Sequence, residues 1–253
     1  MLALARGRFT ARFAESAEDI EAAQALRHQC FVTGRGLPAR PGMALERDGF
    51  DASCRHLLVE HVPSGVLVCC FRLLMLEGGG RIGDSYSAQY YELSALAAYP
   101  GRMAELGRFC IHPDWRDPDI LRIAWAALAR VVDEEGIELL FGCSSFNGTD
   151  GDSYRDAFAL LARNHMAPDR WQPRVKAPDV FRFGRLLRQL IPDPGRAMRA
   201  MPPLLRSYLA MGGWVSDHAV VDRDLATLHV FTGLEIGAIP PARARLLRAT
   251  ATA

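Results

Sequence analysis

The sequence predicts a mixed α/β fold, with helices on both faces of one sheet in a three-layer arrangement. Residues 55–61 and 66–76 are apolar, strand-like runs joined by a Pro-Ser-Gly turn, which predicts an antiparallel hairpin. Residues 105–146 contain a strand, an amphipathic helix and a buried strand, the order of a parallel β-α-β unit. Together these two patterns predict a sheet that is antiparallel at its start and parallel later.

The remaining elements follow from local patterns. Residues 8–13 alternate and predict a strand, and Ser16 before an acidic turn predicts the start of a helix to about residue 32. Residues 34–49 are rich in glycine, proline and charge, which is typical of a loop. We expect helices at 120–135, 152–164 and 204–210, and strands at 138–146, 214–221 and 226–231.

The chain is predicted to divide into a core over residues 1–165 and a second part over residues 166–253. The second part begins as a basic amphipathic segment and is expected to pack on the core. Pro240 and Pro241 introduce a short basic tail, which we expect to be frayed.

Bulk composition indicates a globular protein with a substantial core. Of the 253 residues, 49% are hydrophobic and 23% are charged, and the formal net charge is +1. No run of eighteen apolar residues occurs, and arginines interrupt the N-terminus where a signal peptide needs an apolar stretch. These features predict a cytoplasmic protein, and peripheral contact with an anionic inner membrane is a second expectation.

The cysteines and histidines do not show metal-ligand spacing. The six cysteines form no C-x-x-C pair, and the seven histidines form no H-x-x-x-H pair. We therefore expect free thiols and no metal.

A basic segment over residues 163–206 carries ten basic residues and three acidic ones. Such a charge favours an acidic protein, a membrane surface or nucleic acid as a partner. Nucleic acid is disfavoured, because aromatic residues are few there and no recognition motif is present. An alternative is that the apolar residues pack on the sheet and the arginines are simply solvated. The candidates for carrier-protein or membrane docking are Arg174, Lys176, Arg182, Arg185 and Arg188.

Residues 105–113 are the most informative stretch for chemistry. Glu105 and Arg108 lie three apart in a strand, and strict alternation would place them on opposite faces. Gly107 is a point where a bulge could bring both toward one cleft. The alternative is an edge strand with solvated charges.

Other charged residues point to a patterned site. Arg27 and Phe31 share one face of the first helix. Arg72 lies inside an apolar strand, which is costly unless the charge is paired or faces a cleft. The loop between them contains three acids, Glu46, Asp48 and Asp51.

The spacing of these residues resembles the acyl-homoserine-lactone synthases, which are acyl-carrier-protein-dependent members of the GNAT superfamily. The matching motifs are R-x-x-x-F (Arg27, Phe31), D-x-x-D (Asp48, Asp51), Arg72 and E-x-x-R-F (Glu105, Arg108, Phe109). The chain resembles the sister family of ornithine N-acyltransferases more closely. That likeness includes Arg108 to Pro113, the strand Phe141 to Phe146, and the C-terminal runs Pro203 to Tyr208, Met211 to Val215 and Asp222 to Thr227.

The resemblance implies a GNAT-like fold and a reaction. The α-amino group of L-ornithine would attack a 3-hydroxyacyl thioester on acyl-carrier protein and give lyso-ornithine lipid. Alternatives are acylation of another amino acid such as glutamine, synthesis of a homoserine lactone, or a non-enzymatic module that binds anionic surfaces.

The resemblance also implies residue roles. Glu105 is the candidate base, and Arg108 and Arg72 are candidates to hold the substrate carboxylate. Asp48 and Asp51 would bind an ammonium group or would order the loop through Arg27. Ser144 and Ser145, near the end of the central strand, are candidate substrate contacts.

A missing motif bears on the acyl donor. Acetyl-CoA-dependent members of the superfamily have a glycine-rich turn whose amides bind the pyrophosphate. The corresponding residues are Arg116-Asp117-Pro118-Asp119, which include no glycine and two acids. We therefore expect no bound cofactor, and a phosphopantetheine-linked acyl-carrier protein as co-substrate.

Overall fold

The computed structural model describes residues 2–38 and 44–251. The chain forms two compact units, each assembled from separate stretches of sequence. Unit 1 comprises residues 1–75, 106–137 and 241–253, and unit 2 comprises residues 76–105 and 138–240. The boundary expected after residue 165 stays a prediction, and it falls inside unit 2.

Unit 1 has a sheet with the strand order β1-β2-β3-β4-β6. Its strands are β1 (Ala3–Arg6), β2 (Phe9–Phe13), β3 (Arg55–His61), β4 (Val66–Leu76) and β6 (Met103–Ile111). The antiparallel pairing of β3 with β4 confirms the predicted hairpin, and Gly65 adopts a φ of 66° in its turn. The β1–β2 hairpin extends the sheet beyond the first predicted strand.

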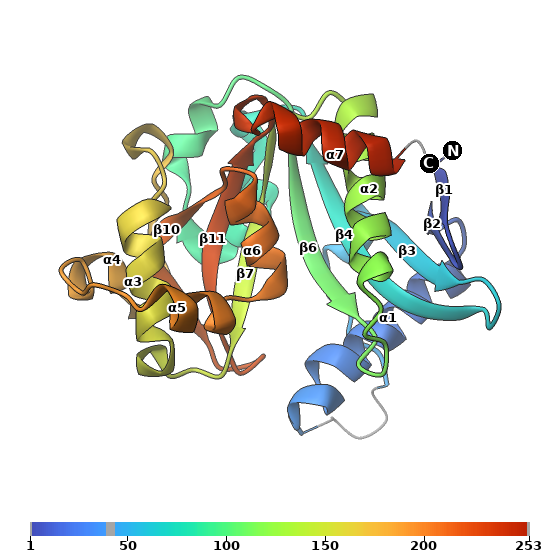
Figure 1. The fold of residues 1–253 in the computed structure, drawn as a ribbon, viewed down its shortest axis with the longest axis horizontal. Coiled ribbons are helices and arrows are strands. Elements are labelled where there is room, and N and C mark those ends of the chain that lie inside the picture. Colours follow the sequence, from blue (N-terminus) through green and yellow to red (C-terminus); the bar gives the residue numbers. More distant parts are fainter. Residues whose placement is uncertain (1, 39–43, 252–253) are drawn as a thin grey trace. The chain divides into compact units, whose positions relative to one another are not determined.

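Helices lie on both faces of this sheet (Figure 1). They are α1 (Ala17–Phe31), α2 (Pro118–Glu134) and α7 (Pro241–Ala251). The predicted N-cap is confirmed, since the Ser16 side chain accepts a hydrogen bond from the Asp19 backbone N–H. Helix α1 packs Ala23 and Leu26 against Leu58, with Cys70 and Cys110 in the same cluster.

The C-terminal tail is a helix, so the expectation of a frayed tail is wrong. Helix α7 packs against α2, and Arg248 forms two hydrogen bonds to the Asp133 carboxylate, at 2.8 and 2.9 Å. Tertiary contact with α2 thus supports a helix whose composition alone gave a weak signal.

The sheet of unit 2 has the strand order β6-β7-β11-β10-β9, and the first part of β6, up to Glu105, belongs to this unit. Its other strands are β5 (Tyr91–Glu92), β7 (Leu139–Asn147), β8 (Arg174–Val175), β9 (Val180–Phe181), β10 (Trp214–Asp222) and β11 (Thr227–Glu235). Strands β6 and β7 are parallel, and Glu105 lies opposite Phe141. All other pairings among these strands are antiparallel, so the predicted mixed sheet is confirmed.

The helices of unit 2 are α3 (Arg155–Asn164), α4 (Phe183–Leu186), α5 (Pro194–Ala200) and α6 (Pro203–Ala210). Helix α3 packs on β7, and α4 packs on β10. Helix α3 contacts both α4 and α5, and α6 contacts β11. Phe158 of α3 packs on Phe146 of β7, with the ring centroids 4.8 Å apart.

Short 3-10 helices make most of the remaining connections. They are η1 (Thr33–Arg35), η2 (Asp51–Ser53), η3 (Gly79–Asp84), η4 (Ser87–Gln89), η5 (Ser94–Ala98), η6 (Gly151–Tyr154), η7 (Asp169–Trp171) and η8 (Ile236–Ala238). Helix η4 lies in the segment that supplies hydrogen bonds to Glu105, described below. The predicted loop over residues 34–49 overlaps η1, and its residues 39–43 lie outside the described part of the chain.

Candidate active site

A buried ion-pair network in unit 1 begins at Arg27 on α1. The Arg27 side chain is 1% exposed, and its guanidinium donates hydrogen bonds to both Asp51 carboxylate oxygens, at 2.7 and 2.8 Å. Its Nε also lies 2.6 Å from the Glu46 carboxylate. Because Arg27 follows Ala23 by four residues, the helix turns both toward the sheet.

Arg72 of β4 enters the same network from the sheet. It is 3% exposed and donates to both oxygens of Asp48, at 2.6 and 2.7 Å, and to Asp51 Oδ1 at 2.7 Å. The charge inside the apolar strand is therefore paired with two loop acids. This is the arrangement that makes a buried guanidinium tolerable.

Arg108 joins from β6 through an irregular backbone. Its φ is 54°, a left-handed conformation that is uncommon for a residue with a side chain and costs about 1–3 kcal/mol. The side chain donates to Glu46 Oε1 at 2.9 Å and to Asp48 Oδ2 at 3.1 Å. The sequence pointed to Gly107 as the position of a bulge. The residue with a left-handed backbone is Arg108, one position later.

The network balances three arginines with three acids and ties the loop to the helix and the sheet. Burial alone would raise the pKa of Asp51, but hydrogen bonds and charges from Arg27 and Arg72 outweigh it and hold that pKa well below its ordinary range. The pKa of Asp48 is lowered for the same reasons, against burial, mainly by Arg72 and then by Arg108. For Asp51 this geometry is the expected ordering of the loop through Arg27, whereas Asp48 is held by Arg72 and Arg108. Their contacts with a substrate stay a prediction.

Glu46 is the residue of this network to which the sequence assigned no role. It bridges Arg27 and Arg108 through its carboxylate, and its backbone N–H donates to the Gln24 carbonyl at 3.1 Å. The sequence signal that could have identified Glu46 is its position beside Asp48 and Asp51 in the acidic loop. Phe31, predicted beside Arg27, is half-buried against the α1 cluster, and the Arg35 guanidinium lies 5.2 Å from its ring centroid.

Glu105 lies in unit 2 and has a separate set of partners. It is 4% exposed, and its carboxylate accepts hydrogen bonds from Tyr86 and Ser87. The Tyr86 N–H donates to Oε2 at 2.8 Å, and the N–H and hydroxyl of Ser87 donate to Oε1 at 2.7 and 2.5 Å. These donors offset the cost of burying a carboxylate and fix its orientation. A shared cleft for Glu105 and Arg108 stays a prediction.

Cys143 and Tyr208 are the next side chains around Glu105 and its donor Ser87. Cys143 lies on β7, and its Sγ is 3.4 Å from the Ser87 hydroxyl. Tyr208 of α6 is buried, and its burial, with the charge of Glu105, raises the pKa of its hydroxyl. Sequence reasoning missed Ser87 and Tyr208, because neither lies near Glu105 in the chain.

The two predicted serines of β7 occupy different environments. Ser144 is buried and accepts a hydrogen bond from the Thr232 hydroxyl at 2.9 Å. Ser145 is exposed and lies opposite His229 on β11. Alternation along the strand separates them, so they do not form one pair of contacts.

The predicted docking residues are exposed in unit 2. Three of them, Arg182, Arg185 and Arg188, flank buried Phe183 and Leu187, while Leu186 is 63% exposed. The other two lie beside the strand β5 and the helix η4. Arg174 Nε is 4.0 Å from the Glu92 carboxylate, and Lys176 donates from Nζ to the Ala88 carbonyl at 2.6 Å. Lys176 therefore holds the segment that supplies the donors to Glu105.

The start of α2 is occupied by the protein's own carboxylate. Asp117 is the N-cap, and its side chain accepts from the Asp119 backbone N–H at 2.9 Å. Pro118 at the first helical position has no N–H to offer. Arg8 lies 2.8 Å from Asp117, and Arg6 and Arg122 pair with Asp119.

Membrane-spanning helices and metal-binding clusters are both absent from residues 2–38 and 44–251. No helix in these ranges has the length and apolar character needed to cross a membrane. No group of three His, Cys, Asp or Glu side chains in them has an arrangement suited to a metal ion.

Comparison with known proteins places this chain among acyltransferases. A family model of the acetyltransferase (GNAT) domain matches residues 26–126. An L-ornithine N(alpha)-acyltransferase of Rhodobacter capsulatus is 36% identical over 87% of this chain and 86% of its own length. A second, from Rhizobium meliloti, is 33% identical over 90% of this chain and 80% of its own length.

A solved structure shows the same fold at low sequence identity. It is that of FeeM, an N-acyl amino acid synthase from uncultured soil microbes, with 13% identity and a TM-score of 0.52. The likeness covers 91% of this chain and 93% of that protein. The chain has a GNAT-type acyltransferase fold and belongs to the family of L-ornithine N(alpha)-acyltransferases.

Proposed function

We propose that this enzyme transfers a 3-hydroxyacyl group from acyl-carrier protein to the α-amino group of L-ornithine. The product would be lyso-ornithine lipid, and the reaction would be the first step of ornithine-lipid synthesis. The acceptor follows from the relatives, which are named for ornithine and resemble this chain over nearly its whole length.

The start of α2 is the observation that carries the choice of donor. A CoA pyrophosphate needs free N–H groups at a helix N-terminus. Here the Asp117 carboxylate already accepts the Asp119 N–H, and Pro118 has no N–H to offer. Because these N–H groups are engaged or missing, the helix start favours a donor without a pyrophosphate, and a phosphopantetheine arm on a carrier protein meets that requirement.

Glu105 is the base in the proposed reaction. The amine nitrogen of ornithine forms a bond to the thioester carbonyl carbon, the carbon–sulfur bond breaks, and the thiol leaves. The ammonium group first loses one proton to solvent. Glu105 then takes a second proton from the nitrogen of the tetrahedral intermediate, and this proton passes to the sulfur as it departs. Ser87 and Tyr86 hold the carboxylate in place through three hydrogen bonds, so its orientation is set before the substrate arrives.

We assign the unit 1 network a supporting role in this reaction. Arg27, Arg72 and Arg108 are engaged with the acids of the loop, which fixes residues 46–51 against α1 and the sheet. Asp48 is the most exposed of the three acids, with 24% of its side chain accessible. Of the three acids it is therefore our choice for contact with an ammonium group.

The basic segment is the proposed docking surface for the carrier protein. Arg182, Arg185 and Arg188 are exposed around a buried apolar anchor, and an acidic partner would complement them. Peripheral contact with an anionic membrane stays a prediction for the same surface.

A donor comparison tests this proposal. The purified enzyme is incubated with L-ornithine and the same 3-hydroxyacyl chain carried either by acyl-carrier protein or by CoA, and acylated ornithine is quantified by mass spectrometry. We expect kcat/KM to be higher with the carrier protein. Equal or greater kcat/KM with CoA would overturn the donor assignment and leave the acceptor assignment standing.

A further inference from the structure

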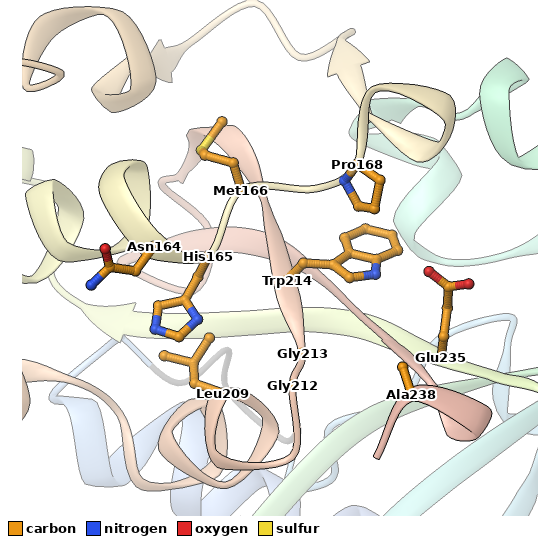
Figure 2. Close-up of a pocket in the computed structure, with 10 residues that line it drawn as sticks. All are labelled: Asn164, His165, Met166, Pro168, Leu209, Gly212, Gly213, Trp214, Glu235 and Ala238. Carbon is orange, nitrogen blue, oxygen red and sulfur yellow. The ribbon is translucent and has the colours of Figure 1, made fainter. Parts of the chain in front are cut away.

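Two features of the described chain play no part in the proposed reaction. One is a pocket of about 450 Å³ in unit 2, between the end of α3, the turn after α6 and the ends of the β10–β11 hairpin (Figure 2). Its one carboxylate, Glu235, is already paired with Arg170 at 3.3 Å, and the rest of its wall does not identify a ligand. The other feature is a cluster of three thiols in unit 1, Cys30, Cys70 and Cys110.

The three thiols come from three elements that meet in the core beneath α1. Cys30 is the penultimate residue of α1, Cys110 is the penultimate residue of β6, and Cys70 lies in β4. The Cys70 and Cys110 sulfurs are 3.5 Å apart. Cys30 packs on the same cluster with its Sγ 3.4 Å from the Ile111 carbonyl oxygen, and its thiol is hydrogen-bonded to that of Cys110. Cys110 therefore contacts both other thiols.

The thiols differ in their access to solvent. Cys30 is half-buried, whereas Cys110 is 5% exposed and Cys70 is 1% exposed. A small oxidant in solution therefore reaches Cys30 before either of the two strand cysteines.

The contact between Cys30 and Cys110 also separates their protonation states. The hydrogen bond with Cys110, helped by the charge of Arg35, lowers the pKa of Cys30 against the effect of burial. Hydrogen bonds with Cys30 and Cys70, together with burial, raise the pKa of Cys110. The thiolate is thus favoured on Cys30, and the thiolate is the form of cysteine that peroxides oxidise.

We propose that Cys30 is a site of oxidation by hydroperoxides and that Cys110 converts the oxidised form to a Cys30–Cys110 disulfide. The Cys30 sulfur attacks one peroxide oxygen, so that a sulfur–oxygen bond forms and the oxygen–oxygen bond breaks. The departing oxygen takes a proton from solvent and leaves as an alcohol, or as water when the oxidant is hydrogen peroxide.

The second step uses the contact between the two thiols. The Cys110 sulfur attacks the sulfur of the Cys30 sulfenic acid, the disulfide bond forms, the sulfur–oxygen bond breaks, and water leaves with the Cys110 proton. The two thiols lose two electrons, and the hydroperoxide gains them.

The disulfide joins α1 to β6 beside the ion-pair network. Arg27 lies one helical turn before Cys30, Arg108 lies two residues before Cys110, and Glu46 bridges these two arginines. The bond closes residues 30–110 into one covalent loop, and this restricts the unfolded chain, so the oxidised protein resists unfolding better than the reduced one. This proposal does not rest on the proposed function.

Peptide mapping of the wild-type enzyme gives a direct test. The reduced protein is treated with hydrogen peroxide, the remaining thiols are alkylated, and linked peptides are identified by mass spectrometry. We expect a Cys30–Cys110 crosslink, with a mass about 2 Da below the sum of the two reduced peptides, that dithiothreitol reverses. Cys54 is the internal control, because it is half-buried like Cys30 but lies outside the cluster, and it should still be alkylated.

Cys110→Ala and Cys54→Ala are matched variants. Peroxide-treated Cys110→Ala should carry a dimedone adduct on Cys30, because the sulfenic acid has lost its partner, and Cys54→Ala should form the crosslink as the wild type does. Oxidation should raise the urea midpoint of the wild type and leave that of Cys110→Ala unchanged. The proposal is overturned if Cys30 stays reduced, if Cys30 is linked to a second molecule, if the crosslink joins Cys70 to Cys110, or if Cys54 is oxidised as fast as Cys30.

Discussion

Replacing Asp51 by asparagine removes the most connected carboxylate of the unit 1 network. Asp51 accepts hydrogen bonds from Arg27 at 2.7 and 2.8 Å, from Arg72 at 2.7 Å and from Gln24 at 2.9 Å. Asparagine has almost the same shape, but it carries no charge and turns N–H donors toward a guanidinium. Two buried arginines then lose their shared counter-charge.

The expected loss of stability follows from that burial. Arg27 and Arg72 are 1% and 3% exposed, so water cannot replace the lost carboxylate. Removing one partner of a buried ion pair costs about 3–5 kcal/mol, whereas the whole free energy of unfolding of a domain is about 5–15 kcal/mol. We therefore expect Asp51→Asn to lower the free energy of unfolding by about 3–5 kcal/mol at pH 7.

Urea unfolding followed by circular dichroism measures this loss. Asp133→Asn is the control, because it removes a carboxylate from the exposed pair with Arg248, and we expect a much smaller change. A loss for Asp51→Asn no larger than that of the control would refute the reasoning, since it would mean that the arginines do not depend on this carboxylate.

The pH dependence gives an independent check on the same carboxylate. The folded-state pKa of Asp51 is depressed, so its contribution is fully present above its unfolded pKa of about 3.9 and is lost as the pH falls toward the folded value. Asparagine does not titrate. The difference in unfolding free energy between wild type and Asp51→Asn should therefore narrow below about pH 4. A constant difference down to pH 2 would contradict this assignment.

Three further predictions concern the proposed reaction. Glu105→Gln should lower kcat by about 10²–10⁴-fold per folded molecule, and unchanged kcat would exclude Glu105 as the base. Ser87→Ala removes the hydroxyl donor to Glu105, so steady-state kinetics should show a smaller fall in kcat than for Glu105→Gln, and urea unfolding should show a stability loss of about 1–3 kcal/mol. A kcat loss equal to that of Glu105→Gln would contradict a purely positioning role. The double variant Arg185→Glu/Arg188→Glu should raise KM for the carrier-bound donor and leave KM for ornithine unchanged, and the rise in donor KM should become smaller at high salt. An unchanged donor KM would mean that the carrier protein does not dock on these arginines.

Local patterns predicted most of the fold because most elements carry their own signals. Ser16 with an acidic first turn identified the start of α1, and Gly65 marked the β3–β4 turn. The β1–β2 hairpin was missed because its first strand is only four residues long, although Gly7, with a φ of 55°, forms its turn. Helix α7 was missed because its stability comes from contact with α2, which lies far away in the sequence.

The candidate site could be predicted only as a set of residue types. The need to pair a buried Arg72 pointed correctly to the loop acids, because an unpaired guanidinium in a strand is unfavourable. The left-handed backbone of Arg108 gave no sequence signal, since the neighbouring glycine was the more plausible position for it. The hydrogen bonds from Ser87 to Glu105 depend on how the 76–102 segment folds back on β6, which local patterns do not specify.

The measurement that tests the central claim most directly is the identification of the reaction product. Purified enzyme is incubated with 3-hydroxyacyl-acyl-carrier protein and an equimolar mixture of L-ornithine, L-lysine and L-glutamine, and the products are analysed by tandem mass spectrometry. We predict that ornithine is the preferred acceptor and that fragmentation places the acyl group on its α-nitrogen. Acylation of the δ-nitrogen, or preferred acylation of lysine or glutamine, would contradict the account.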